Sequence, residues 1–204
     1  MDLIQIGVDE VGRGCLAGPV SACAYIFNDG IESLPGLRDS KKMTPKSRAA
    51  MEPLLIQSGR HGYGEASQAE VDDIGIDEAN FLAMRRAIEN LGLYDLSDFV
   101  LIVDGNKKPP FDDMGIGDIQ CIVKADDTVP SVSAASVIAK VRRDRYMADM
   151  AEKFPGYDFH SNVGYGSSKH LAAIETMGPC EIHRMSFAPM SKKVKKTSAY
   201  SMKR

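Results

Sequence analysis

The sequence predicts an α/β fold. Short apolar runs rich in β-branched residues, which indicate buried strands, alternate with longer segments of helical periodicity. In addition, acidic residues stand at the ends of three of the apolar runs. The ends of strands in an α/β sheet can converge on one site. The same pattern therefore predicts the fold class and the place of a functional site.

Length and composition are those of an ordinary soluble protein. A chain of 204 residues is long enough for one main domain and a small extension. Hydrophobic residues make up 44% of it and charged residues 26%, and no apolar run approaches the roughly 20 residues that cross a bilayer. The N-terminus has no signal-peptide pattern. We therefore expect a cytoplasmic protein that does not bind a membrane.

Cysteine usage agrees with that compartment. The four cysteines are scattered, without a CxxC pair or histidines at zinc-finger spacing. We expect them to be reduced and to serve as small buried hydrophobic side chains, rather than as thiol nucleophiles or soft-metal ligands.

Charge is distributed unevenly along the chain. Six of the 25 basic residues, and no acidic residue, lie between Ser191 and Arg204. The remaining 19 bases face 28 acids, which leaves a body with a net charge near −9. Such a body could hold cations in a carboxylate cluster while the tail touches a polyanion. The alternative for the tail is a solvated, disordered terminus.

The apolar runs predict five strands. Residues 3–9 and 20–27 form neighbouring strands joined by a glycine-rich turn, and residues 61–67 form a weaker third strand. The run FVLIVDGN is a buried strand that delivers Asp104 to a turn. The run IQCIVKADD repeats this design, so its two aspartates are expected at the mouth of another strand.

Capping and breaker signals predict the helices. Thr44 is an expected N-cap followed by Pro45 at the first helical position, and Pro53 should kink or end that helix. Ser67 and Glu70 form an expected capping box. Helical periodicity then predicts three further helices, within residues 79–92, 131–154 and 168–177.

The acids at the strand ends form the main candidate site. They are Asp9 with Glu10, Asp104, and either Asp126 or Asp127. Four like charges in one pocket repel one another and raise some of their pKa values, and divalent cations remove that difficulty. Adjacent strand residues point to opposite faces, so the first pair reaches one site only if the chain turns there, which the nearby glycines make easy.

The donor chemistry of this set indicates the kind of metal. Oxygen-only ligands favour Mg²⁺ or Mn²⁺, and the absence of a His or Cys cluster from the sequence argues against zinc. Two such ions, roughly 3.5–4 Å apart, can activate a water and stabilise the leaving oxygen during in-line attack on phosphorus. Taken singly, each acid could instead be an N-cap, a turn former or a salt-bridge partner.

Two other motifs are weaker. The segment GYGSSK, at residues 164–169, lacks the GxxxxGK[ST] spacing of a phosphate loop. One predicted helix carries four bases that could line a phosphate backbone, namely Lys140, Arg142, Arg143 and Arg145. A solvated helix face is the commoner meaning of such a run.

Six segments match, in order, the motifs of one known family. GVDEVGRG is similar to the opening motif, LRDSKKMT to a D-S-K-K segment, VDGN to the strand with the third acid, and KADDTVPSVSAASVIAKVRRD to the fourth acid and its helix. NVGYGSSKH and HRMSFAP are similar to the closing motifs. Between about Ile6 and Pro189 the sequence thus resembles the ribonuclease HII family, the bacterial type 2 ribonucleases H.

The resemblance implies a fold and an activity. The implied fold is ribonuclease H-like: a mixed central sheet flanked by helices in a catalytic domain (residues 1–155), a mostly helical C-terminal extension packed on it (156–190), and a basic tail (191–204). The implied activity is a metal-dependent endoribonuclease using Mg²⁺ or Mn²⁺. It would hydrolyse the RNA strand of RNA:DNA hybrids, incise at ribonucleotides in duplex DNA, leave 3′-hydroxyl and 5′-phosphate ends, and act as a monomer.

The resemblance also assigns residues. The family's four catalytic, metal-binding carboxylates correspond to Asp9, Glu10, Asp104 and Asp126. Asp126 is chosen over Asp127 because the family's aspartate lies ten positions before the serine that ends an A-A-S triplet, here Ser136. The implied substrate-binding residues are Gly12, Arg13, Gly14, Lys41, Asn106, Ser136, Lys140 and Tyr165.

Three departures from the family pattern and two alternatives accompany this interpretation. Ala125 replaces a usual glycine, Val163 a usual lysine and Ser167 a usual threonine; loss of the lysine would remove one phosphate contact. A ribonuclease HIII-like sibling is one alternative, which the GRG turn, in place of GKG, disfavours. A catalytically silent hybrid-binding protein is the other, and the presence of every expected acid argues against it.

Overall fold

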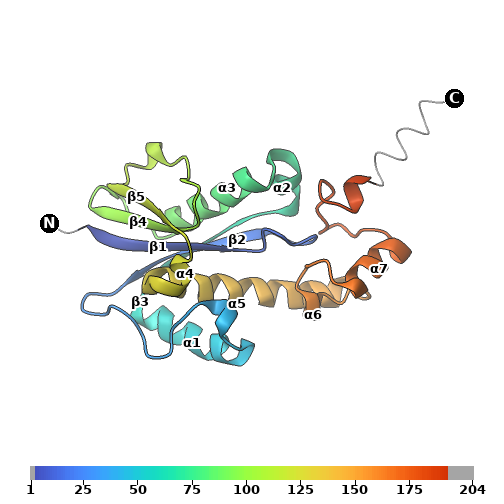
Figure 1. Cartoon of the computed structure of the whole chain (residues 1–204), viewed down its shortest axis with the longest axis horizontal. Coiled ribbons are helices and arrows are strands. Elements are labelled where there is room, and N and C mark those ends of the chain that lie inside the picture. Colours follow the sequence, from blue (N-terminus) through green and yellow to red (C-terminus); the bar gives the residue numbers. More distant parts are fainter. Residues whose placement is uncertain (1–2, 193–204) are drawn as a thin grey trace.

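A five-stranded mixed sheet forms the centre of the protein, and helices cover both of its faces (Figure 1). The structure is a computed structural model that describes residues 3–192. The strands lie in the order β3-β2-β1-β4-β5, and their bounds are β1 Ile4–Val11, β2 Val20–Phe27, β3 Gly59–Ala66, β4 Phe99–Asp104 and β5 Asp118–Ile122. This arrangement confirms the α/β class and the mixed sheet.

Parallel pairing brings the ends of two acid-bearing strands together. The central strand β1 is antiparallel to β2 and parallel to β4, with Val8 opposite Val103. The next residues along the two strands are Asp9 and Asp104, which therefore lie at the same edge of the sheet. β5 continues the parallel half, with Ile122 opposite Asp104.

The helices form two layers. Figure 1 shows α2 and α3 on one side of the sheet and α1 and α5 on the other, with α6 and α7 beside one end of α5. Their bounds are α1 Pro45–Ser58, α2 Gln68–Ile74, α3 Ile76–Glu89, α4 Ala125–Thr128, α5 Pro130–Lys153, α6 Phe159–Asn162 and α7 Ser168–Met177. Two short 3-10 helices occupy Ser40–Lys42 and Asp112–Met114. In the described part of the chain, no helix is both long and apolar enough to cross a membrane.

Successive residues of β1 point to opposite faces of the sheet. Ile6 and Val8 belong to the hydrophobic core that also contains Ala83 and Met84 of α3. Gly7 points the other way and lies against the first turn of α5, where an added Cβ would be 2.2 Å from the carbonyl carbon of Ser131. The sheet and α5 therefore approach each other more closely than a side chain at this position would permit.

One local expectation was wrong, and another stays a prediction in part. Pro53 lies inside α1 without ending it, and a kink at Pro53 stays a prediction. Pro53 is on the exposed face, and Ala49, whose carbonyl loses its helical N–H partner, is exposed too, so water can satisfy that carbonyl. Asp126 and Asp127 do not lie at a strand mouth; they lie in α4, because Lys124 adopts a left-handed conformation (φ 63°) and turns the chain after β5.

Most of the other expected elements are confirmed. The third strand is β3, Ser67 and Glu70 form a reciprocal capping box, and the final helix is α7. A short helix that the sequence patterns did not predict, α6, lies between α5 and α7. The domain boundary at residue 155 stays a prediction, and residues 193–204 of the predicted basic tail lie outside the described residues.

The close contact at Gly7 predicts a large effect of a small substitution. Gly7→Ala should destabilise the protein by about 1–3 kcal/mol or more, because the added methyl group meets backbone atoms of α5 that cannot rotate away. A thermal melt should show it, at roughly 2–4 °C per kcal/mol. Gly14→Ala is the matched control for stability, since its Cβ would lie 3.8 Å from the nearest atom. Equal melting temperatures for the two variants would refute the proposed contact.

Candidate active site

Asp9 and Glu10 lie on opposite faces of β1. The strand stays extended through Val11, so the chain does not turn between the two acids; it turns at Gly12, which has a φ of +90°. Asp9 is 3% exposed and is paired across the sheet with Cys23, which packs in the core against α5. Glu10 lines a cavity on the α3 side. The two side chains therefore project from opposite faces of the sheet, near the C-terminal end of β1.

Asp104 and Asp126 are joined through the backbone of α4. The carboxylate of Asp104, at the end of β4, accepts a hydrogen bond of 2.7 Å from the Ala125 N–H. Asp126 follows directly, is 4% exposed, and accepts a hydrogen bond of 2.8 Å from Lys41 Nζ. Asp127 has a side chain that is 39% exposed and pairs with Lys42 at the surface. The two adjacent aspartates thus differ in burial: Asp126 is buried, and Asp127 is exposed.

Burial and mutual repulsion act together on three of these acids. Burial raises the pKa of Asp9 well above its ordinary value, and the charge of Glu10 adds to the rise. Burial also raises the pKa of Glu10, although the Arg13 guanidinium opposes it. At Asp104, burial and then the Asp126 charge raise the pKa. These carboxylates are therefore short of compensating positive charge.

Lys41 supplies part of that charge. Burial opposes its ionisation, yet the hydrogen bond to Asp126 and the charges of Asp9 and Asp126 raise the pKa of Lys41 above its ordinary range. It stands in a 3-10 helix that is attached to α5 by a hydrogen bond of 2.8 Å between the Ser40 and Ser136 hydroxyls. A hydrogen bond with Ser136 also lowers the pKa of Asp9. Both predicted residues, Lys41 and Ser136, are thus beside the carboxylates.

The donor set fits a hard cation. Within residues 3–192, no three His, Cys, Asp or Glu side chains are already gathered as a metal-binding group, which agrees with the placement of Glu10 on the opposite face from Asp9. However, the acids offer only oxygen donors, their pKa values are raised for want of positive charge, and an ammonium group is already bound among them. Such a set suits Mg²⁺ or Mn²⁺ rather than a soft metal.

A buried arginine near the C-terminus holds the glycine turn that follows β1. Arg184 is fully buried and donates hydrogen bonds of 2.8 Å to the carbonyls of Gly12 and Arg13, and one of 3.0 Å to that of Gly18. Burial lowers the pKa of Arg184 to about 10. The sequence motif HRMSFAP contains this residue, but no pattern in the sequence indicates its role.

A second buried arginine extends the same scaffold. Arg143 of α5 is fully buried and donates to the carbonyls of Ala17, Pro19 and Val163 at 2.8–3.1 Å. It therefore lines neither a phosphate backbone nor a solvated helix face. The other bases of this predicted run are paired with protein groups; Lys140, for example, lies 2.8 Å from Asp144.

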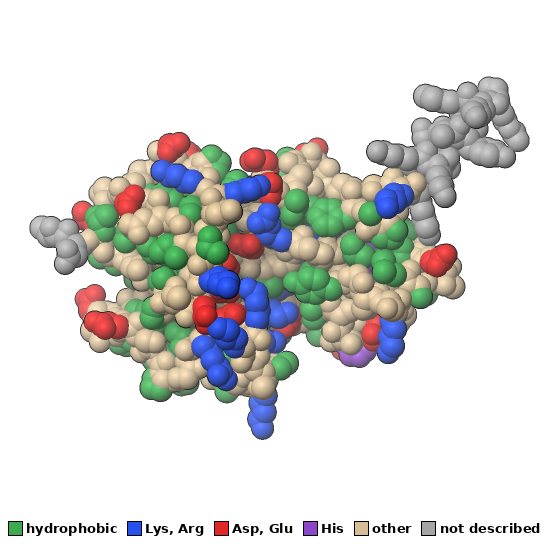
Figure 2. Space-filling view, viewed as in Figure 1, with side chains coloured by type: hydrophobic (Ala, Val, Ile, Leu, Met, Phe, Trp, Pro, Cys, Tyr) green, Lys and Arg blue, Asp and Glu red, His purple; other side chains and the backbone are tan. Residues whose placement is uncertain are grey.

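The remaining predicted substrate residues surround the turn. Arg13 pairs with Asp77 of α3 at 2.6 Å. The Tyr165 ring is the nearest neighbour of Gly14, 3.8 Å from where a Cβ would lie, and Asn106 lines the same cavity as Glu10. In Figure 2, acidic side chains near the centre of the face lie within a band of Lys and Arg side chains. This surface could contact a polyanion around the carboxylates.

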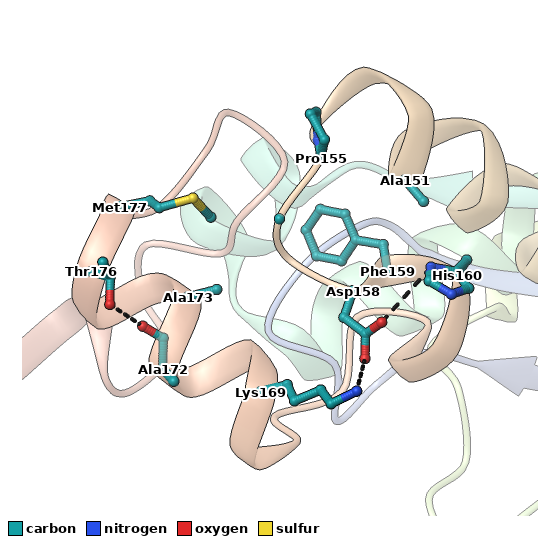
Figure 3. Close-up of a pocket in the computed structure, with 11 residues that line it drawn as sticks. Ala151, Pro155, Asp158, Phe159, His160, Lys169, Ala172, Ala173, Thr176 and Met177 are labelled. Carbon is teal, nitrogen blue, oxygen red and sulfur yellow. Dashed lines mark hydrogen bonds and ion pairs between the residues drawn. The ribbon is translucent and has the colours of Figure 1, made fainter.

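A separate hollow lies in the C-terminal part of the protein. It has a volume of about 700 Å³ and is lined largely by apolar groups of α5, α6 and α7 (Figure 3). Asp158 is at its rim, 4.0 Å from Lys169 and 3.8 Å from His160. None of the four candidate carboxylates lines it.

Known proteins are similar to this chain in sequence and in fold. A family model described as Ribonuclease HII matches residues 6–190. The Ribonuclease HII of Burkholderia cenocepacia (strain HI2424) is 45% identical over 191 residues, which cover 93% of this chain and 85% of that protein. The ribonuclease H2 of Pyrococcus horikoshii OT3 superposes with a TM-score of 0.77 at 25% identity, over 94% of this chain and 97% of that one. A chain of the PCNA:RNase HII complex from Archaeoglobus fulgidus has a TM-score of 0.73 at 26% identity, over 89% and 92%.

The raised pKa of Asp9 predicts that its removal stabilises the metal-free protein. Because the folded-state pKa lies above the unfolded value near 4, wild-type stability should fall as the pH rises from about 4 through the raised pKa. Asp9→Asn does not titrate, so in chelator at pH 7 it should melt at a higher temperature, by roughly 2–4 °C per kcal/mol of repulsion removed. The gain should disappear as the pH falls toward 4.

Glu70→Gln is a control of opposite sign. A hydrogen bond from Arg86 lowers the pKa of Glu70 to about 2, so its stabilising contribution is present above the unfolded pKa and is lost as the pH falls. This variant should melt at a lower temperature than wild type at pH 7. A large loss of melting temperature in Asp9→Asn would instead mean that Asp9 is a structural residue.

Proposed function

The chain belongs to the ribonuclease HII family and is an endoribonuclease of the ribonuclease H type; from that membership we propose that it hydrolyses the RNA strand of RNA:DNA hybrids and also cuts at ribonucleotides embedded in duplex DNA. The proposed cut breaks the bond between phosphorus and the 3′ oxygen. Water supplies the new oxygen on phosphorus and a proton reaches the leaving oxygen, so the products are a 5′-phosphate and a 3′-hydroxyl. We further propose that the enzyme acts as a cytoplasmic monomer.

One observation carries the proposal: three carboxylates with raised pKa values, those of Asp9, Glu10 and Asp104, lie with the buried Asp126 at one end of the sheet, beside a glycine turn. Asp9, Glu10, Asp104 and Asp126 would hold divalent cations, Mg²⁺ or Mn²⁺. When bound, the cations activate water and stabilise the leaving oxygen. The protein's own part is to hold the acids in place through the sheet, α4 and Ser136, and to keep Lys41 charged beside them.

The glycine turn supports recognition of the ribose. A 2′-hydroxyl both donates and accepts hydrogen bonds, and backbone groups can approach it closely where no side chain intervenes. Gly14 is exposed and provides that access, while Gly12 is buried against the Arg143 side chain. Arg184 binds the carbonyls of Gly12 and Arg13, and the Tyr165 ring is the nearest neighbour of Gly14. We infer that the sugar of the cut nucleotide lies between this turn and Tyr165.

A DNA duplex with a single embedded ribonucleotide tests the proposal. Wild-type protein should cut it in Mg²⁺ or Mn²⁺ and should leave an all-DNA duplex intact. In chelator the cutting should stop. The opposite outcome is a well-folded protein that binds RNA:DNA hybrid but cuts neither the hybrid nor the single-ribonucleotide duplex in Mg²⁺ or Mn²⁺. That result would identify the silent hybrid-binding alternative, and the proposal would fail.

The structure also predicts a sharp difference between two adjacent aspartates. Asp126→Asn should lower kcat/KM by at least ~100-fold, because the buried carboxylate is a proposed cation ligand and such charge stabilisation contributes several kcal/mol. Asp127→Asn is the matched control and should stay within about threefold of wild type, since it removes only a surface ion pair with Lys42. Steady-state cleavage of a labelled hybrid measures both. Equal losses, or the reverse order, would refute the assignment of Asp126.

A further inference from the structure

Asn80 is a buried polar side chain whose carbonyl oxygen has no partner. The residue lies on the inner face of α3 and is 3% exposed. Among the described residues, Asn80 Oδ1 is the buried side-chain polar atom that lacks a hydrogen bond. Leaving such an acceptor unpaired in the interior destabilises a protein. An unpaired oxygen of this kind points to a ligand that supplies the donor.

The surroundings of Asn80 identify the chemistry of that ligand. Asn80 lines a cavity of about 250 Å³ together with Glu10, Asp104 and Asn106, which is room for several water molecules. The two positive groups that line the same cavity are already engaged: Arg13 and Lys107 are paired with Asp77, at 2.6 and 2.7 Å, and Arg13 also lies 3.9 Å from Glu10. Two further carboxylates, those of Glu10 and Asp104, line the cavity with the Asn80 amide, a set that suits a hydrated cation better than a phosphate.

The other end of the amide group is already engaged. A hydrogen bond from the Asn80 side chain lowers the pKa of Glu10. The donor in that bond is the amide nitrogen, since the carbonyl oxygen can only accept. Asn80 thus holds one proposed cation ligand with its nitrogen, while its oxygen, buried beside the cavity, has no partner among the described residues.

We propose that Asn80 is a positioning residue for the cation site: its nitrogen orients Glu10, and its oxygen accepts a hydrogen bond from the hydration shell of a divalent cation held by Glu10 and Asp104. The inference rests on the proposed function, because it takes these acids as cation ligands. Mg²⁺ in particular keeps several of its waters when it binds to carboxylates, and those waters need acceptors. Groups that position ligands in this way typically change metal affinity by about 10–100-fold.

Calorimetric titration of Mn²⁺ alone into the full-length protein, without nucleic acid, tests the proposal. Asn80→Leu keeps the shape but removes both polar atoms, and should weaken binding by about 10-fold or more. Asn80→Asp keeps an acceptor oxygen and adds charge, so it should bind Mn²⁺ at least as tightly as wild type. Asn90→Leu, at the far end of the same helix, is the control and should leave the affinity unchanged. Should Asn80→Leu not fold, Asn80→Ala replaces it.

Thermal melts distinguish this role from a merely structural one. In chelator, Asn80→Leu should melt at or above the wild-type temperature, because it removes an unpaired buried oxygen. Added Mn²⁺ should then stabilise it less than wild type. Unchanged Mn²⁺ affinity in a folded Asn80→Leu overturns the proposal, including the case in which only hybrid binding weakens. If Mn²⁺ affinity depends on Asn80 as expected, yet the wild-type protein cuts no hybrid, this inference stands while the proposed function fails.

Discussion

The burial of carboxylates close to one another at one end of the sheet is the constraint on which the rest of the structure depends. The parallel pairing of β1 with β4 puts Asp9 and Asp104 side by side, and α4 adds Asp126. Burial and like charge raise the pKa values of Asp9 and Asp104, so ionising these acids lowers the stability of the folded protein. The protein offsets only part of that cost, through Lys41 and Ser136. The remaining deficit of positive charge is the reason that we propose a cation site there, and the unpaired oxygen of Asn80 is part of the argument for that site.

The C-terminal part of the chain takes part in building the site through its backbone contacts. Arg184 follows α7 in sequence but binds the carbonyls of the turn after β1, and Arg143 fastens that turn to the segment before α7 through Ala17 and Val163. A buried guanidinium is costly unless hydrogen bonds satisfy it, and each of these two groups bonds three carbonyls. The exposed Gly14 leaves the turn open to a ligand, while the two buried arginines hold the loop that contains it.

The sequence was sufficient for elements set by local patterns and insufficient for roles set by tertiary contacts. The strands ending in Asp9 and Asp104 follow from apolar runs, and β3 and α7 were found from weak alternation and a glycine stop. The motif order also identified the family. By contrast, the left-handed residue that places Asp126 in a helix, and the burial that separates it from Asp127, depend on packing against α5. Charged residues on a helix suggested a phosphate-binding or solvated face, and only the fold shows that Arg143 points inward. Asn80 could have been noticed as an amide on an otherwise apolar helical stripe, but its unpaired oxygen is visible only in three dimensions.

Anomalous diffraction from crystals grown with Mn²⁺ tests the central claim most directly, because it locates the cations without relying on activity. The account predicts that Mn²⁺ would be bound directly by oxygens of Asp9, Glu10, Asp104 and Asp126, with Lys41 displaced from Asp126 or sharing it. Mn²⁺ bound only elsewhere, with the Lys41 ammonium still bound to Asp126 and no ion among the four carboxylates at saturating metal, would contradict it.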